Sequence, residues 1–234
     1  TVLFSVLSTS LFAQASSSIE GKIEGIPEGN LQLLVRNSET GWNTVCTVPF
    51  SNGRFSMPNI KISEPMQARL GVVGYQGGFS FFIEPGTSYN ALLRDGEGWF
   101  IHGKGLQDTD LAYQERCMSM MKSLSALQNR ADSLRKALRY GSASRVNDTI
   151  AQMRKALENE RAAFLSANNN ILSAALILQD AESQDASLET SKQLYAQLGD
   201  KAKQSRCGQI LQQRILRLQM ISKGSKAPDF TLPT

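Results

Sequence analysis

The stretch from Asn43 to Ile60, NTVCTVPFSNGRFSMPNI, decides the architecture of the first half of the chain. Two short apolar runs flank a central Ser51, Asn52 and Gly53. An Asn-Gly pair supplies the positive φ angles that a tight hairpin turn requires. The stretch therefore predicts an antiparallel hairpin whose turn is Asn52 and Gly53.

The same pattern of short apolar runs and turn residues extends from Ser16 to about Gly105. The run SSIEGKIEGI precedes the breaker Pro27-Glu28-Gly29-Asn30, and we expect it to form a hairpin with the LQLLVRN run that follows. Further runs, separated by Gly and Pro, are QARLGVVG, GFSFFIEPG, SYNALLR and WFIHGKG. Roughly seven short strands in about ninety residues predict a small antiparallel β-sandwich over residues 16–105.

After Gly105 the hydrophobic period changes to that of a helix. A stripe with alternating spacings of three and four residues consists of Tyr113, Cys117, Met120, Leu124, Leu127, Ala131, Leu134 and Leu138. A second stripe consists of Val146, Ile150, Met153, Leu157 and Phe164. The short polar segment between them predicts a long antiparallel helical hairpin over residues 106–167, with its tip near Gly141. Three further helices are expected over residues 170–222 of the helical region 106–223. The predicted fold class is thus α+β.

The first fifteen residues, TVLFSVLSTSLFAQA, are apolar and end in Ala-Gln-Ala, the small-x-small pattern of a signal peptidase site. The run is too short to span a bilayer as a helix. We therefore expect residues 1–15 to be the remnant of a signal peptide. The mature protein is then expected to be exported, to a periplasm or cell envelope, and to have no membrane span.

Composition and cysteine spacing restrict the classes of function. The chain has 234 residues and a formal net charge of +4, and its basic residues are mixed with acids, so no nucleic-acid partner is expected. Cys46, Cys117 and Cys207 form neither a CxxC motif nor metal-ligand spacing. We interpret each as a small buried hydrophobe; the alternatives are a disulfide, with Cys117 and Cys207 as one pairing, or a reactive thiol.

The remaining candidate residues have ordinary structural interpretations. The single histidine, His102, lies in an apolar strand-like run without nearby metal ligands. The acid pairs Asp108 with Asp110 and Glu158 with Glu160 are typical of helix starts and solvated helix faces. Phe79, Phe81 and Phe82 are expected to face a core. Met118, Met120 and Met121 are expected to fill gaps between packed side chains. Met118 and Met121 lie outside the stripe, so an interface on that face of the helix is an alternative. We assign no catalytic, cofactor-binding or metal-binding residue and no cofactor.

The last stretch, GSKAPDFTLPT, resembles the start of thioredoxin-like domains of the AhpC/TSA and TlpA type. In those domains a Gly-x-x-Ala-Pro-Asp-Phe segment precedes the sheet that carries a redox CxxC. The matching positions are Gly224, Ala227, Pro228, Asp229, Phe230 and Leu232. The order of a signal peptide, a small β domain and a helical region before this segment resembles exported proteins in which a domain of unknown function precedes the redox domain. The chain has no CxxC, so the catalytic cysteines of the family correspond to no residue here.

The resemblance implies a non-catalytic N-terminal accessory region of a thiol-disulfide oxidoreductase, with residues 224–234 as linker and first strand at a domain junction. Its partner would be a C-terminal thioredoxin-like domain of the same parent chain, and a homodimer through the helical hairpin is a further expectation. The alternative is a free-standing envelope module that binds a peptide or glycan, with a helical spacer. That alternative predicts an exposed cluster among Trp42, Tyr75, Phe79 and Trp99. A third hypothesis, disulfide exchange by the chain itself, predicts a thiol of depressed pKa.

Overall fold

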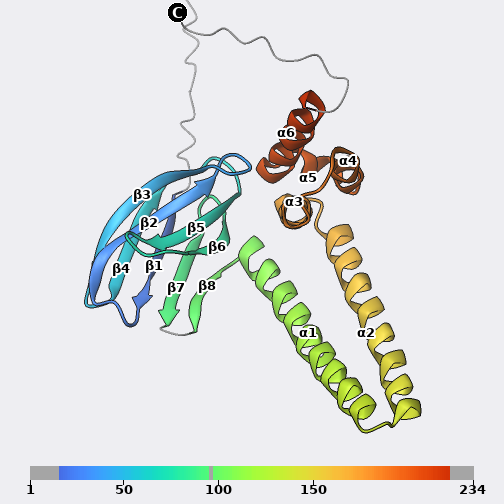
Figure 1. The fold of residues 1–234 in the computed structure, drawn as a ribbon. Coiled ribbons are helices and arrows are strands. Elements are labelled where there is room, and N and C mark those ends of the chain that lie inside the picture. Colours follow the sequence, from blue (N-terminus) through green and yellow to red (C-terminus); the bar gives the residue numbers. More distant parts are fainter. Residues whose placement is uncertain (1–15, 95–96, 222–234) are drawn as a thin grey trace, which may run out of the picture.

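The structure is a computed structural model that describes residues 16–94 and 97–221. The expected signal peptide, residues 1–15, and the thioredoxin-like segment, residues 224–234, lie outside the described residues. The described chain forms a curved sheet, a long two-helix arm and a compact cluster of helices, as Figure 1 shows.

One mixed sheet contains all the described strands, in the order β6-β5-β2-β3-β4-β1-β7-β8. The strands are β1 (Ser17–Ile23), β2 (Glu28–Arg36), β3 (Trp42–Ser51), β4 (Arg54–Ile60), β5 (Met66–Val72), β6 (Phe79–Ile83), β7 (Ser88–Arg94) and β8 (Gly98–Gly103). Neighbours pair antiparallel except β1 and β7, which run parallel from Ser18 opposite Ser88 to Ile23 opposite Leu93. The outer strands β6 and β8 approach each other, so the sheet curls into a nearly closed barrel.

The predicted antiparallel β-sandwich is therefore wrong. Alternating side chains such as Ile19, Leu31, Leu33 and Leu70 are buried, as predicted for a half-buried strand, but they meet inside a single curled sheet. Alternation along a strand shows that one face is buried; it does not show whether a second sheet or the same sheet covers that face.

The strand pairing confirms one predicted turn and corrects another. Ser51 pairs with Arg54, and Asn52 and Gly53 between them have φ angles of 52° and 66°, so the Asn-Gly turn joins β3 to β4 as expected. The expected hairpin of β1 with β2 does not form, because β1 pairs with β4 and β7 while β2 pairs with β3 and β5. Local spacing predicted the breaker after β1, yet the partners of β1 come from residues about 35 and 70 positions later in the chain.

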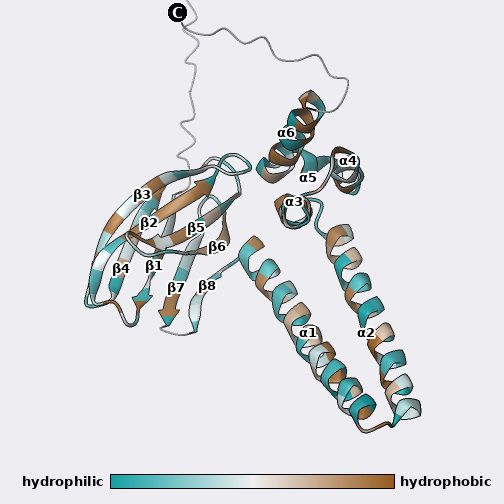
Figure 2. Ribbon diagram, in the orientation of Figure 1, coloured by the Kyte–Doolittle hydropathy of each residue, from teal (hydrophilic) through white to brown (hydrophobic). Residues whose placement is uncertain are grey.

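Within residues 97–221, six helices follow the sheet. They are α1 (Leu106–Lys136), α2 (Tyr140–Ala167), α3 (Ile171–Ser183), α4 (Leu188–Ala196), α5 (Asp200–Gln204) and α6 (Arg206–Met220). We call α1 and α2 together the arm: they lie side by side and project from the rest of the molecule, and Figure 2 shows hydrophilic and hydrophobic residues interspersed along both. Helices α3 to α6 form a cluster whose buried core includes Ile177, Leu178 and Leu211. Phe82 of β6, Tyr113 of α1 and Phe164 of α2 also pack in this core.

The helical part of the predicted fold also needs correction. The described part of the helical region comprises six helices, four of which follow the arm, where a hairpin and three further helices were expected. The chain turns between Lys136 and Tyr140, and Gly141, the expected tip, lies inside α2. Leu138, the last member of the predicted stripe, is 72% exposed because it belongs to that turn.

Gln107, in the first turn of α1, links the two outer strands of the sheet. Its side-chain oxygen accepts a hydrogen bond from the Phe82 backbone N–H of β6 at 2.9 Å, and its side-chain nitrogen donates to the Ile101 carbonyl of β8 at 3.1 Å. Gln107 is 1% exposed, so water does not replace either partner. The amide thus satisfies two strand-edge groups that would otherwise be buried without a partner.

We expect Gln107→Leu to lower the free energy of unfolding by about 2 to 3 kcal/mol, because a side chain of similar size leaves both backbone groups unsatisfied. Urea denaturation followed by circular dichroism measures the change. Gln152→Leu, at an exposed position on α2, is the matched control and should change stability by no more than about 0.5 kcal/mol. Equal effects of the two substitutions would contradict the role of Gln107.

Candidate functional site at the junction of sheet and helices

The sheet meets the helical cluster through a set of buried arginines. Arg36, the last residue of β2, is 8% exposed and forms an ion pair with Glu182 of α3. Its guanidinium also donates to the side-chain oxygen of Gln67 at 3.2 Å and to the Glu39 carbonyl at 2.8 Å. A planar guanidinium has enough donors to join β2, β5 and α3 at one point.

A second group of charges ties the β2–β3 connection to α6. Glu39 forms ion pairs with Arg214 and, at 2.5 Å, with Arg217. Arg214 is 6% exposed and also donates to the Ala186 carbonyl at 3.2 Å. At the start of α6, Arg206 donates to the Asn37 carbonyl at 3.0 Å. Glu39 and Arg214 are largely removed from water, so each depends on its partner, whereas the Arg217 side chain is 55% exposed.

A cavity of about 260 Å³ lies beside this junction, and we call it the junction pocket. Aromatic and aliphatic side chains line one part, and polar side chains from both the sheet and the helices line the rest. Its lining residues are Arg36, Gln67, Ser80, Phe81, Phe82, Asp110, Tyr113, Gln114, Phe164, Leu172, Ala175, Leu176, Gln179 and Glu182. Small-molecule sites usually measure about 300 to 1,000 Å³ and have a mostly apolar lining, so the junction pocket is smaller and more polar than most of them.

Asp110 is the unusual group of the junction pocket. Burial raises the pKa of its carboxyl group from 3.8 to about 6, although the hydrogen bond from Gln114, 2.6 Å long, favours the charged form. One turn further along α1, Tyr113 stacks on Phe164 of α2 with ring centroids 4.0 Å apart, and burial raises the pKa of the Tyr113 hydroxyl to about 12. The pocket can accept a small polar molecule, and near pH 6 Asp110 can either donate or accept a proton.

The cysteines are all free thiols. Cys207 is buried in the core of the helical cluster, and burial raises its pKa to about 12. Burial also raises the pKa of Cys46. Cys117 is partly buried and packs against the same core as Cys207 without forming a disulfide. A raised pKa keeps Cys46 and Cys207 protonated, which disfavours the hypothesis that either is a reactive thiolate.

The other predicted candidates are scattered. His102 is exposed on β8, next to Asp108 in the first turn of α1, and both line an open groove beside the sheet. Glu160 pairs with Arg116 across the arm at 2.6 Å. In the part of the chain that the structure describes, no group of three or more His, Cys, Asp or Glu could hold a metal ion.

The aromatic residues of the binding-module alternative do not form an exposed cluster. Phe79 and Trp99 are partly buried against the core of the sheet. Trp42 is also partly buried, with the Arg69 guanidinium 4.5 Å from its ring centroid. Only Tyr75 among the four is largely exposed, at 61%. Carbohydrate or peptide binding on an aromatic face therefore loses its expected support.

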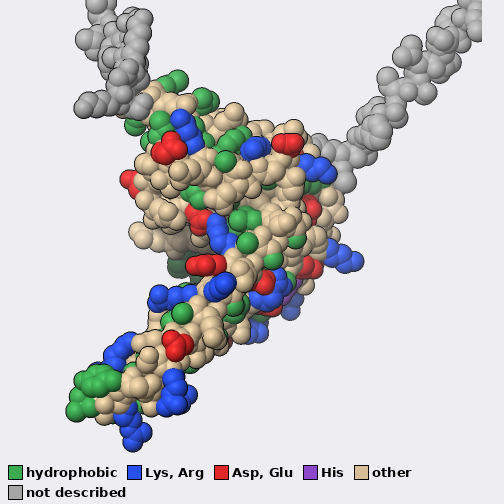
Figure 3. All heavy atoms as spheres, turned by 90° about the vertical axis from the view of Figure 1, so that its right-hand side faces the viewer, with side chains coloured by type: hydrophobic (Ala, Val, Ile, Leu, Met, Phe, Trp, Pro, Cys, Tyr) green, Lys and Arg blue, Asp and Glu red, His purple; other side chains and the backbone are tan. Residues whose placement is uncertain are grey.

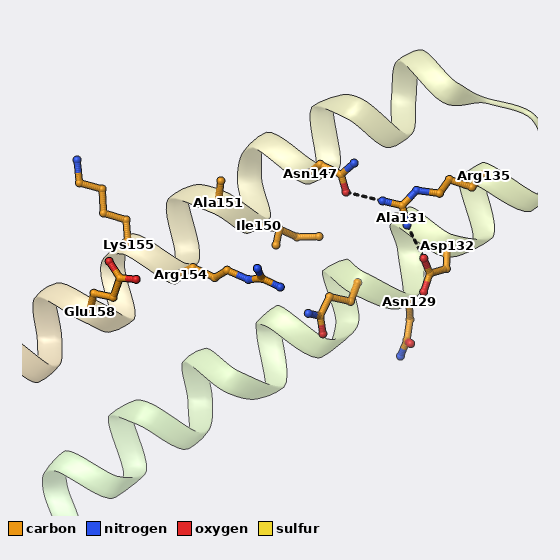
Figure 4. A pocket seen from close by; sticks show the side chains of 11 residues that line it. Asn129, Ala131, Asp132, Arg135, Asn147, Ile150, Ala151, Arg154, Lys155 and Glu158 are labelled. Atoms are coloured by element: carbon orange, nitrogen blue, oxygen red, sulfur yellow. Dashed lines mark hydrogen bonds and ion pairs between the residues drawn. The ribbon is translucent and has the colours of Figure 1, made fainter. Parts of the chain in front are cut away.

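An open groove of about 840 Å³ runs along the outer half of the arm. Figure 4 shows Ile150 and Arg154 extending from α2 toward α1. Arg135 of α1 joins Asp132 at 2.5 Å and the side-chain oxygen of Asn147 in α2 at 3.0 Å, as the dashed lines in Figure 4 mark. The Asn147 contact fastens the two helices together just before the turn between them, whereas the Asp132 pair lies within α1.

Sequence analysis missed the junction residues Arg36, Glu39 and Arg214. A signal existed for Arg214, because it follows Cys207, Ile210 and Leu211 at helical spacing and thus falls on the apolar face of α6. A charge at such a position indicates a buried ion pair. Glu39 lies in a connection between strands, where a charged residue carries no comparable signal.

The raised pKa of Asp110 predicts that stability depends on pH. The folded protein binds more protons than the unfolded chain between about pH 4 and pH 6, so stability falls as the pH rises through this range. Asp110→Asn should remove this loss and stabilise the protein at pH 7 by up to about 2 kcal/mol, with no gain below pH 4. Burial also raises the pKa of Asp180. Asp180 is present in both the wild type and Asp110→Asn, so its effect on stability cancels in the difference between them.

Urea denaturation at pH 4, 5, 6 and 7 tests this expectation. Asp108→Asn, at an exposed position two residues earlier on α1, is the control and should cost about 0.5 kcal/mol through the helix dipole. A variant Asp110→Asn that is less stable than the wild type at pH 7 would mean that the carboxylate has a favourable partner there.

Comparisons with known proteins do not place the chain in a family. No protein-family model matches the sequence, and no curated protein matches it significantly. The function must therefore be inferred from the geometry described above and from the sequence itself.

Proposed function

We propose that the chain is the non-catalytic N-terminal accessory region of an exported thioredoxin-like thiol-disulfide oxidoreductase, and that it positions the redox domain. The sequence support is the segment Gly224 to Leu232, with its Ala227-Pro228-Asp229-Phe230 core. The structural support is that α6, the helix before this segment, is held to the sheet by the ion pairs of Glu39 with Arg214 and Arg217. This fixed α6 is the observation that carries the proposal.

A fixed helix before a linker determines where the next domain can move. Glu39 and Arg206 together bind both ends of α6 to the β2–β3 connection. A domain joined to α6 by a short linker would be kept near this side of the sheet, at an effective concentration set by the linker length. The accessory region would thus present a partner surface to the redox domain or to its substrate protein.

The cysteines of the described chain support the proposal that disulfide exchange takes place in the neighbouring domain and not in this region. Burial disfavours the thiolate form of Cys46 and Cys207, and a thiolate is the attacking species in disulfide exchange. In the proposal, exchange belongs to a CxxC of the neighbouring domain. The arm, with its long exposed faces, would be the site of the proposed homodimer. No described helix is both long and apolar enough to cross a membrane.

The first test is to determine the gene sequence beyond the codon for Thr234. We expect the reading frame to continue into a thioredoxin-like domain with a CxxC motif. The absence of such a motif within the next domain length would contradict the proposal and leave a free-standing module as the better interpretation. The parental protein should also reduce a protein disulfide, and that activity should require the CxxC.

The second test weakens the link between α6 and the sheet. We expect Glu39→Gln to lower the free energy of unfolding by about 2 kcal/mol, because buried Arg214 then keeps only the exposed Asp185, 3.3 Å away, as a charge partner. In the parental protein it should slow reduction of a protein disulfide while leaving reduction of a small aromatic disulfide unchanged. Glu24→Gln, which breaks the exposed pair with Lys22, is the control and should cost less than about 1 kcal/mol. Equal rates for wild type and Glu39→Gln would contradict a positioning role.

A further inference from the structure

The turn at the end of the arm exposes two adjacent apolar side chains. We call Lys136 to Tyr140, which joins α1 to α2, the tip. Leu138 is 72% exposed and Tyr140 is 63% exposed. Figure 3 shows hydrophobic side chains gathered at the far end of the projecting arm, with basic side chains beside them. Exposed apolar residues that are grouped in this way indicate a contact site more strongly than single ones do.

Basic residues surround these apolar side chains. Residues 130–148 contain five basic side chains and two acidic ones, a net charge of +3 within a chain whose formal net charge is +4. The basic residues are Arg130, Arg135, Lys136, Arg139 and Arg145. The end of the arm therefore carries a local excess of positive charge.

The tip is held in a defined conformation. Backbone hydrogen bonds from the Leu138 N–H to the Arg135 carbonyl, at 2.9 Å, and from the Arg139 N–H to the Leu134 carbonyl, also at 2.9 Å, close the turn. The Arg135 side chain bonds to Asn147 of α2. The exposed side chains are thus presented without a large loss of conformational entropy on binding.

We propose that the tip binds peripherally to the surface of an anionic lipid bilayer. Leu138 would enter the boundary between headgroups and acyl chains, and Tyr140 would lie at the headgroup level, where an amphipathic ring is favoured. Lys136 and Arg139, on either side of Leu138, would contact acidic headgroups, which attract basic side chains close to the surface.

The shape of the tip favours lipid over other polyanionic partners. A stable protein interface buries about 800 Å² on each side, which a convex turn with two apolar side chains does not provide. Nucleic-acid binding would leave Leu138 in water, because single strands are held by stacking on aromatic residues within a basic groove. A fluid bilayer adapts to a convex surface and takes up both the apolar and the basic side chains.

Binding at the tip would also set the distance of the sheet from the membrane. At 1.5 Å per residue, the 31 residues of α1 extend about 45 Å from Gln107 to the tip. The sheet and the helical cluster lie toward the other end of the arm, as Figure 1 shows. The proposal does not depend on the proposed redox neighbour.

The test is sedimentation of the full chain with phosphatidylcholine vesicles that contain about one third phosphatidylglycerol, against vesicles of phosphatidylcholine alone. We expect binding to the anionic vesicles only, weakening as salt rises. The pair Lys136→Gln and Arg139→Gln should reduce partitioning about twenty-five-fold, since each basic residue contributes about fivefold. The pair Leu138→Ser and Tyr140→Ser should reduce it about tenfold.

Matched pairs elsewhere in the chain serve as controls. Lys61→Gln with Lys192→Gln makes the same change in net charge away from the tip, and Met118→Ser with Met121→Ser removes two exposed apolar side chains nearer the base of α1. Both control pairs should bind like the wild type, and thermal melting should show that all variants fold. The charge pair remains informative even if the serine pair does not fold.

Three results would overturn the proposal. One is that the wild type does not bind anionic vesicles at low salt. Another is that a control pair weakens binding as much as the corresponding tip pair, which would indicate non-specific attraction. The last is that a duplex oligonucleotide competes with the vesicles and binds more tightly.

Discussion

The side-chain amide of Gln107 is the contact on which the arrangement of the sheet and the arm depends. A curled sheet that stops short of closure leaves two strand edges, and one amide with a donor and an acceptor joins them by bonding to Phe82 and Ile101. The same region holds the start of α1, because the Glu84 carboxylate that follows β6 accepts a hydrogen bond from the Leu106 N–H at 2.7 Å. The residues at the start of α1 therefore both join the outer strands of the sheet and attach the arm to it.

The charges at the junction have a different role from that of the apolar cores. The sheet and the helical cluster have separate hydrophobic cores, and Phe82 of β6 is the buried sheet residue that packs in the core of the cluster. Arg36, Glu39 and Arg214 instead require specific partners, since a buried charge without its counter-ion is costly. These ion pairs fix the relative placement of two bodies that hydrophobic packing alone would leave adjustable.

The sequence predicts local structure well here and long-range pairing poorly. Asn52 and Gly53 identify their turn because the positive φ angles that it requires depend only on which residues occupy these two positions. The partners of β1 are not local, and the alternation of Ile19 and Ile23 is the same in a sandwich and in a curled sheet. The helical spacing likewise places Leu124 and Ala131 between the two helices of the arm. The same spacing continues to Leu138, so it does not show that the helix ends at Lys136. The candidate site depends on contacts between residues far apart in the sequence, such as Arg36 with Glu182, which no local pattern contains.

The two ends of α1 explain why an exposed turn can have a defined position. At its start the helix is attached to both outer strands through Gln107, and along its length it packs against α2, with an added ion pair between Arg116 and Glu160. Arg161 of α2 in turn pairs with Asp180 of α3, so the second helix of the arm is attached to the helical cluster. The tip is therefore connected to the sheet through α1 and to the helical cluster through α2. Because Arg36 and Glu39 join the sheet to the cluster, the three parts form a closed loop of contacts, and contact at the tip would orient the whole molecule rather than the arm alone.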